Sequence, residues 1–201
     1  MGNAASIVGQ EEFDRYQQQL PRAPHDIAYS ELEKICSTGI FLNSKIPSAR
    51  AQYKALVEVA IQKGKLDNLE ILIPAGNIES LNPVHTAAKY GNLECLELLN
   101  SAGFNAELSD EQGRVPIHLC AMNRSASSAL CTHYLAVVAP KVVNYRDKKG
   151  DTPLLTALKR NNIEIFDALL LAGAKLDLPD ESGTSCRQLA TELEHLDILK
   201  V

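Results

Sequence analysis

The chain has 201 residues, 45% of them hydrophobic and 22% charged, so it can bury a core and does not have the composition of a disordered tail. Its formal net charge of −5 argues against nucleic-acid binding, because neutralising phosphates requires clustered Lys and Arg side chains. Aromatic residues make up only 5% and Trp is absent, so the core must come from Ala, Leu, Ile and Val, which favours closely packed helices.

The first segment, residues 1–26, contains a run of three glutamines and two prolines and is predicted to form a flexible arm. It begins Met1-Gly2-Asn3-Ala4-Ala5-Ser6, which fits the N-myristoylation pattern of Gly2 exposed after Met removal and a hydroxyl at Ser6. This start resembles the N-termini of known myristoylated proteins. A single C14 chain binds membranes only reversibly, and no second signal is obvious. Residues 1–20 contain no Cys to palmitoylate, and their single basic residue, Arg15, is outweighed by Glu11, Glu12 and Asp14.

Residues 27–50 are predicted to form a capping region before the main domain. The segment from Ser30 to Cys36 has the pattern of a short helix, with Ser30 as its N-cap and Gly39 ending it. We expect this helix to pack on the first structural repeat that follows.

Three later segments share one pattern, with Pro at the second position and Ala near the end. They are Asn82-Pro83-Val84-His85-Thr86-Ala87-Ala88, Val115-Pro116-Ile117-His118-Leu119-Cys120-Ala121 and Thr152-Pro153-Leu154-Leu155-Thr156-Ala157-Leu158. Their prolines are 33 and 37 residues apart. The pattern resembles the ankyrin repeat, whose signature is T-P-L-H-x-A with a period of about 33 residues.

Further landmarks extend this resemblance beyond the signature. Gly91-Asn92 and Asn161-Asn162 stand where an ankyrin repeat turns between its two helices, and Gly103 and Gly173 stand where the second helix ends. Proline suits a first helical turn, because its missing N–H would lack a partner there, and glycine supplies the left-handed residue that closes a helix.

The resemblance implies an all-α ankyrin-repeat solenoid of stacked helix–turn–helix units with short β-hairpin fingers. We place it at residues 51–201, with repeats near 54–81, 82–114, 115–151, 152–184 and 185–201. The first and last copies are degenerate, as terminal repeats must be to face water. Between Gly76 and Pro83 a finger is largely missing. The third repeat has about four extra residues near 124–128, where we expect a longer loop, and Pro140 replaces its closing Gly.

Two constellations could suggest chemistry. His118, Cys120, Cys131 and His133 offer four metal-capable ligands, but neither pair has a usual zinc spacing, and the first two occupy the ankyrin histidine and a buried alanine position. His85 and His118 recur because the repeat recurs, so we interpret them as structural. No phosphate loop, nucleophile elbow or paired-carboxylate motif is found. We expect no catalysis, cofactor or metal.

Ankyrin proteins bind partners on the concave face formed by finger tips and first helices, and the resemblance implies the same face here. On the first helices it comprises Thr86, Lys89, Tyr90, Leu119, Met122, Asn123, Thr156, Lys159 and Arg160, and at the tips Glu111, Gln112, Arg114, Arg146, Lys148, Lys149 and Asp151. This face is basic in an acidic chain, which suits an acidic partner segment, although it could equally be a solvated surface. Tyr90 and Met122 are candidate anchors. We expect charge reversal at Lys159 and Arg160 to weaken binding without lowering stability.

The leading functional hypothesis is a non-catalytic adaptor or scaffold that binds another protein. The alternative is an ankyrin-type regulatory inhibitor that binds and covers an enzyme or signalling partner. No apolar run approaches the roughly 18 residues of a membrane span, and no secretory signal pattern is present. With five scattered cysteines interpreted as reduced thiols, we expect a cytoplasmic monomer with a peripheral membrane pool held by myristate.

Overall fold

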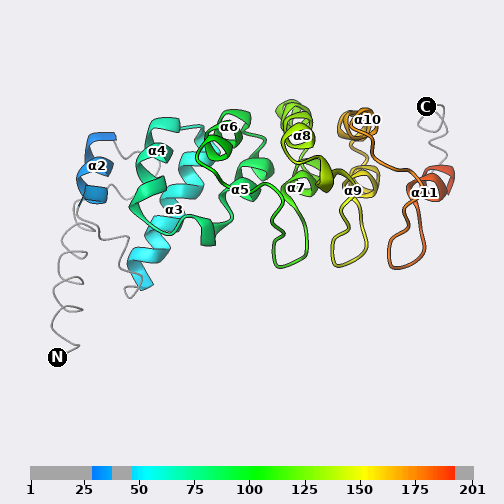
Figure 1. Ribbon diagram of the computed structural model, residues 1–201, viewed down its shortest axis with the longest axis horizontal. Coiled ribbons are helices and arrows are strands. Elements are labelled where there is room, and N and C mark those ends of the chain that lie inside the picture. The colour runs from blue at the N-terminus through cyan, green and yellow to red at the C-terminus, as the bar shows by residue number, and fades with distance from the viewer. Residues whose placement is uncertain (1–28, 38–46, 193–201) are drawn as a thin grey trace. The chain divides into compact units, whose positions relative to one another are not determined.

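The computed structural model describes residues 29–37 and 47–192 (Figure 1). The predicted arm with its myristoylation motif, Gly39 and the end of the last predicted repeat therefore lie outside the described residues. Among the helices that are described, none is long and apolar enough to cross a membrane.

Throughout the described ranges the chain forms helices joined by turns and longer loops, and no residue there is in a β-strand, which confirms the all-α prediction. The α-helices are α2 (Tyr29–Ser37), α3 (Pro47–Lys63), α4 (Leu66–Ala75), α5 (Pro83–Tyr90), α6 (Leu93–Ser101), α7 (Pro116–Met122), α8 (Ala126–Val138), α9 (Pro153–Lys159), α10 (Ile163–Leu171) and α11 (Cys186–Glu192). Two short 3₁₀ helices, η3 (Glu79–Leu81) and η4 (Pro140–Asn144), complete the set.

The chain divides into two compact units, the first ending at Pro83 and the second beginning at Val84. In the first unit α2 and α3 both pack against α4, the second helix of the first predicted repeat. The Tyr53 hydroxyl joins α3 to α4 by donating to the Leu72 carbonyl at 2.8 Å. Ser30 was expected at the N-cap, but α2 begins one residue earlier, so Ser30 is part of the helix itself.

The segment between Gly76 and Pro83 forms the 3₁₀ helix η3 where later repeats have a finger. η3 ends at Leu81, and the next residue, its C-cap Asn82, adopts a left-handed conformation with φ of 49°. Asparagine tolerates this region better than most residues because its short polar side chain can hydrogen-bond locally. The first predicted repeat therefore leads into the second through a compact turn only.

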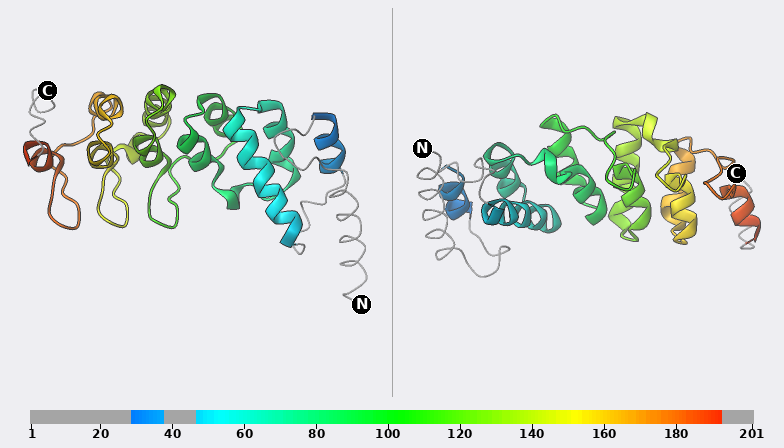
Figure 2. Two further views of the ribbon diagram at one scale, coloured as in Figure 1. Left: turned by 180° about the vertical axis from the view of Figure 1, so that it is seen from behind. Right: turned by 90° about the horizontal axis from the view of Figure 1, so that it is seen from below.

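The second unit has two rows of helices (Figures 1 and 2). The inner helices α5, α7 and α9 lie on the side of the loops, and the outer helices α6, α8 and α10 lie on the opposite side. Contacts run along both rows, because α8 packs on α6, α7 and α10, and α7 packs on α9. The core between the rows consists of fully buried apolar side chains, among them Leu96, Leu99, Ile117, Leu135, Leu154 and Phe166.

Three loops, which we call the fingers, comprise residues 110–114, 147–151 and 180–184. Each starts with an aspartate whose Oδ1 accepts the backbone N–H groups two and four residues later at 2.8–3.0 Å. A single pair of residues closes each loop through a backbone hydrogen bond, such as the one from Asp147 N to Asp151 O at 2.9 Å. The glycine at the fourth position has φ between 76° and 85°. The fingers are thus tight aspartate-held loops.

Backbone and histidine hydrogen bonds join each finger to its neighbours. Lys148 N donates to Gln112 O and Glu181 N donates to Lys149 O, both at 3.0 Å. Nε2 of His118 lies 3.0 Å from the Asp151 carbonyl, and its Nδ1 accepts the N–H of Val115 at 3.3 Å. Because Nδ1 is an acceptor, Nε2 carries the proton and donates to the finger.

The expectation of a longer loop near residues 124–128 is wrong. Only residues 123–125 separate α7 from α8, and the extra residues instead lengthen α8 to 13 residues, against 9 in α6 and 9 in α10. Ser125 is the N-cap residue of α8 but makes no side-chain capping bond, and Ser127 and Ser128 lie in the first turn of the helix. Asn123 Oδ1 supports this start by accepting the Ser125 N–H at 3.0 Å. After α8, Pro140 begins η4.

Two finger glycines provide a test of how tightly the fingers pack. A Cβ on Gly150 would lie 2.7 Å from the Glu181 nitrogen, whereas a Cβ on Gly183 would have no atom within 4 Å. We expect Gly183→Ala to lower the free energy of unfolding by about 1 kcal/mol through its positive φ alone. Gly150→Ala should lower it by roughly 3 kcal/mol, since the backbone clash adds to the strain. Urea denaturation measures both, and equal losses would show that the fingers are not in firm contact.

Candidate protein-binding groove

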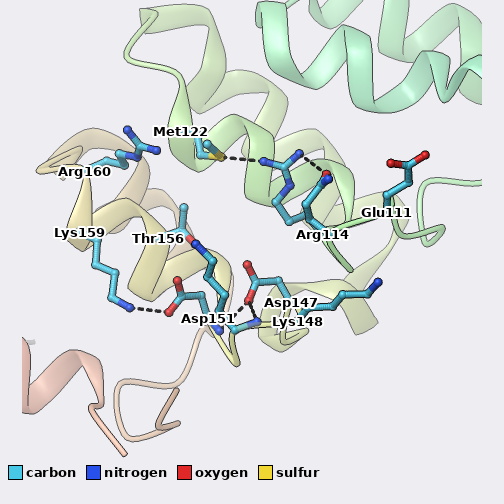
Figure 3. A pocket seen from close by; sticks show the side chains of 11 residues that line it. Glu111, Arg114, Met122, Asp147, Lys148, Asp151, Thr156, Lys159 and Arg160 are labelled. Carbon is cyan, nitrogen blue, oxygen red and sulfur yellow. Dashed lines mark hydrogen bonds and ion pairs between the residues drawn. The ribbon is translucent and has the colours of Figure 1, made fainter. Parts of the chain in front are cut away.

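A cavity of about 500 Å³ lies between the first two fingers and the inner helices α7 and α9 (Figure 3). It is lined by Glu111, Gln112, Arg114, Met122, Asp147, Lys148, Lys149, Asp151, Thr156, Lys159 and Arg160. A second cavity of about 420 Å³ shares Arg114 and Met122 with the first and continues toward α5 through Lys89, Leu119 and Asn123. We call these two adjoining cavities the groove.

The structure brings together most of the residues expected on the binding face. The first cavity contains Arg114, Met122, Lys148, Lys149, Thr156, Lys159 and Arg160, and the second contains Lys89, Leu119 and Asn123. Three expected residues line neither cavity: Thr86, Tyr90 and Arg146. The Tyr90 ring is partly covered, with the Lys89 ammonium 5.0 Å from its centre, and the Arg146 Nε donates to the Gly150 carbonyl at 3.2 Å.

Sequence reasoning missed Asp147, which lines the groove and also holds the second finger together. The signal was present as an aspartate three residues before a glycine in each finger: Asp110, Asp147 and Asp180. Aspartates of this kind commonly accept backbone N–H groups from their own turn. The repeated spacing could therefore have assigned Asp147 to the structure of the loop.

Arg114 is held in place by its own finger. Its Nε and Nη2 donate to Asp110 Oδ2 at 2.8 and 2.7 Å, and Nη2 also donates to Gln112 Oε1 at 3.0 Å. Burial alone would raise the pKa of Asp110, but the hydrogen bonds from Arg114 hold it below its ordinary value. Arg114 Nη1 lies 3.6 Å from the Met122 sulfur and thereby forms part of the groove floor. Its charge is largely offset by Asp110.

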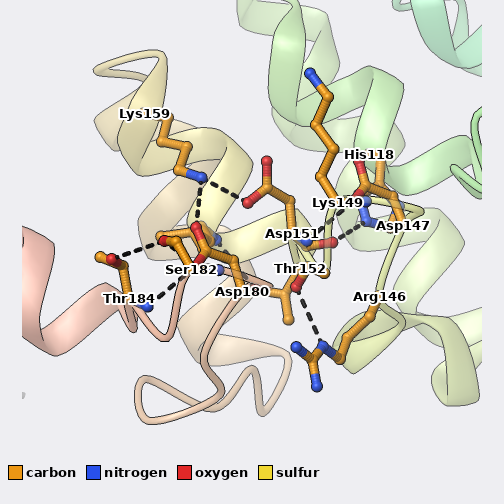
Figure 4. A network of polar contacts seen from close by, with 12 residues as sticks. His118, Arg146, Asp147, Lys149, Asp151, Thr152, Lys159, Asp180, Ser182 and Thr184 are labelled. Atoms are coloured by element: carbon orange, nitrogen blue, oxygen red, sulfur yellow. Dashed lines mark hydrogen bonds and ion pairs between the residues drawn. The ribbon is translucent and has the colours of Figure 1, made fainter.

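Lys159 joins the second and third fingers (Figure 4). Its Nζ lies 2.6 Å from Asp151 Oδ1 and 2.9 Å from Asp180 Oδ2. The Ser182 hydroxyl, which donates to the Asp180 carboxylate at 2.6 Å, and the Lys159 ammonium together hold the pKa of Asp180 well below its usual range. Although partial burial would lower the pKa of Lys159, the two carboxylates raise it. Lys159 is therefore a structural cation.

Four other groove cations are exposed: Lys89, whose ammonium lies 5.0 Å from the centre of the Tyr90 ring, and Lys148, Lys149 and Arg160. Within the described ranges Lys148, Lys149 and Arg160 form no ion pair with a carboxylate. Lys148 and Lys149 lie at the tip of the second finger, and Arg160 follows the end of α9. In the first cavity, the positive charge available to a ligand is thus concentrated at Lys148, Lys149 and Arg160.

The two repeat histidines are structural, as interpreted from the sequence. His85 Nε2 lies 2.9 Å from the Arg114 carbonyl, and both nitrogens of the fully buried His118 are hydrogen-bonded to backbone. Burial lowers the pKa of both side chains, which keeps them neutral. His133 lies exposed on α8, so it does not share a site with His118. No three His, Cys, Asp or Glu residues of the described part are grouped as metal ligands.

Comparison with known protein families identifies repeats in the segments that form this groove. A model of three ankyrin repeats matches residues 56–137 and a single-repeat model matches residues 149–181, so that together they cover more than half of the chain. The chain belongs to the ankyrin-repeat family. Ankyrin repeats generally bind other proteins and are not catalytic, so the domain is a protein-interaction module.

Curated ankyrin relatives are similar over this domain. The ankyrin repeat protein nuc-2 of Neurospora crassa is 33% identical over 126 residues, which cover 59% of this chain and 12% of the relative. Ankyrin repeat and SOCS box protein 11 of Mus musculus is 28% identical over 109 residues, covering 54% of this chain and 32% of the relative. The chain therefore spans no more than about a third of either relative.

The pairing of Lys159 corrects the expectation that charge reversal at Lys159 and Arg160 would leave stability unchanged. Lys159→Met would leave the Asp180 carboxylate, only 8% exposed, without its ammonium partner. We expect a loss of about 1–2 kcal/mol in the free energy of unfolding. Arg160→Gln removes an unpaired exposed charge and should change stability by less than about 0.5 kcal/mol. Denaturant titration of both variants measures these free energies of unfolding. Similar losses in the two variants would show that Lys159 is not a structural cation.

Proposed function

We propose that this ankyrin-repeat chain is a non-catalytic adaptor whose groove captures an acidic segment of a partner protein. The observation that carries the proposal is the division of the cations in the first cavity into two classes. Arg114 and Lys159 are held by carboxylates, whereas Lys148, Lys149 and Arg160 are exposed without such partners in the described residues. Unpaired charges on a concave surface attract segments of opposite charge and speed their association.

The floor of the groove supports a peptide ligand with at least one apolar side chain. Met122 is half-buried and borders both cavities, and Leu119 lines the second. Methionine adapts its shape to different apolar partners because its side chain is unbranched and polarizable. An extended segment could place an apolar residue on Met122 while its carboxylates approach the second finger and Arg160. This arrangement matches the usual interface pattern of an apolar centre with a polar rim.

The finger-tip lysines can be tested with little risk to the fold. The second finger uses the backbone of Lys148 and Lys149, and no described contact uses either ammonium group. We expect Lys148→Glu with Lys149→Glu to weaken binding of an aspartate- and glutamate-rich 12-residue peptide with a central leucine by about tenfold or more. Fluorescence anisotropy with labelled peptide at low salt measures the affinity.

The matched control for this test is Lys141→Glu with Lys175→Glu. These two exposed lysines lie outside the groove, and their reversal changes the net charge by the same amount. The control should bind the peptide nearly as well as the unmodified chain, and both double variants should keep its thermal midpoint. Equal weakening in the two double variants would mean that net charge alone attracts the peptide, and the groove would be excluded as the site.

We further propose that myristate on Gly2 tethers the adaptor reversibly to membranes. The support is the sequence pattern alone, with Gly2 after the initiator Met and a hydroxyl at Ser6. One acyl chain gives only marginal membrane binding, so the tether should be reversible and depend on a second contact, such as a membrane-bound partner.

The lipid proposal predicts different behaviour for two glycines of the same segment. In cells supplied with an azide-bearing myristate analogue, Gly2→Ala should abolish labelling and shift the protein from the membrane to the soluble fraction. Gly9→Ala, a matched change outside the modified position, should keep both labelling and distribution. Labelling that survives Gly2→Ala would disprove the tether.

A further inference from the structure

The outer helix α8 carries apolar residues on both of its faces. Its buried face includes Cys131 and Leu135. On the outward face Leu130 and Val137 are 59% and 67% exposed, with the partly exposed Tyr134 between them. These three outward positions are spaced i, i+4, i+7 and therefore form one stripe along the helix. A helix that is apolar all round is normally buried on all sides.

The neighbouring outer helices show that this stripe is specific to one part of the unit. The three outer helices can be aligned on their buried leucines, Leu99, Leu135 and Leu169. In this alignment Leu130 of α8 corresponds to Glu94 of α6 and Glu164 of α10. In the same register Val137 corresponds to the exposed Ser101 of α6 and to Leu171 of α10, which is 91% exposed. The apolar surface thus extends from α8 onto the end of α10, whereas α6 remains polar.

Acidic side chains border the stripe on both sides. Glu94 and Glu97 of α6 and Glu164 and Asp167 of α10 are all exposed, and both helices pack against α8. The sequences of α6, α8 and α10 contain no Lys or Arg. We call the stripe with Leu171 and these four acids the outer face.

We propose that the outer face docks an amphipathic helix of a partner protein, with an apolar stripe flanked on both sides by Lys or Arg. Leu130, Tyr134, Val137 and Leu171 contact the apolar stripe, and the acids of α6 and α10 pair with the basic flanks. The charge arrangement selects this occupant. An anionic lipid surface would be repelled by four carboxylates, and a two-fold contact between two copies would place acids opposite acids.

This second interaction is independent of the groove. The groove lies among the fingers and the inner helices, and the outer face lies on the opposite row (Figures 1 and 2). The two surfaces also have opposite charge, so they recognise partners of opposite charge. Both can therefore be occupied at the same time, and each can be removed without affecting the other.

The test uses the full chain and two labelled synthetic helical peptides. One has leucines at i, i+3, i+4 and i+7 with lysines on both flanks, and the other replaces every lysine with glutamate. Leu130→Gln with Val137→Ser removes two of the three apolar side chains of the stripe, and both positions are exposed, so the fold is kept. Leu108→Gln with Tyr145→Ser is the matched control, since these apolar residues are 54% and 42% exposed outside the outer helices.

We expect the lysine peptide to bind and the glutamate peptide not to bind. The stripe variant should weaken binding of the lysine peptide by about tenfold or more, and Glu164→Gln with Asp167→Asn should weaken it several-fold at low salt. The matched control and the Lys148→Glu, Lys149→Glu variant should bind as the unmodified chain does. Four outcomes overturn the proposal: no binding of the lysine peptide, equal binding by the stripe variant, a self-association in sedimentation that the stripe variant abolishes, or a vesicle affinity lost in the same variant.

Discussion

The second unit depends on the hydrogen bonds that the first aspartate of each finger accepts from the backbone of its own loop. By accepting two backbone N–H groups of its own loop this aspartate fixes the loop in the shape that lets the next finger donate to it. The histidines add a bond from the preceding inner helix to the same loop. Every contact of this kind joins neighbours only, so the unit is a sum of locally specified pieces, as in other repeat proteins. These loops form one wall of the groove and fix the positions of its finger cations.

Charge is distributed unevenly over the second unit. Only the charged side chains without an ion-pair partner are fully available to a ligand. A count of basic residues on the inner side overstates the charge that a ligand meets, because Arg114 and Lys159 already have carboxylate partners. The outer helices have the reverse composition, with acids and no Lys or Arg. A chain with a modest net charge of −5 can therefore present one basic and one acidic surface. Net charge alone describes neither of them.

Periodicity was enough to predict the helices, because prolines, alanines and glycines at repeated positions each have a local physical reason to be there. It also placed Met122, Lys148 and Arg160 on one surface. It could not predict the partners of Lys159, since Asp180 lies 21 residues away and approaches only when two fingers stack. The serines near residue 126 favoured a loop by composition, yet Ser127 and Ser128 lie in the first turn of α8. Tertiary contacts decided between these two outcomes.

The extra length of α8 has a consequence for how such a repeat can grow. Four residues advance a helix by about 1.1 turns and about 6 Å, so the residues beyond the insertion keep nearly the same direction. Two extra residues would rotate the helix by about 200° and turn Leu135 out of the core. The added turn also needs room: a Cβ on Gly91 would lie 2.9 Å from the Ser128 Oγ. In this repeat the added turn therefore lies beside a glycine of the preceding repeat, so an insertion in one repeat and a small residue in its neighbour share the same space.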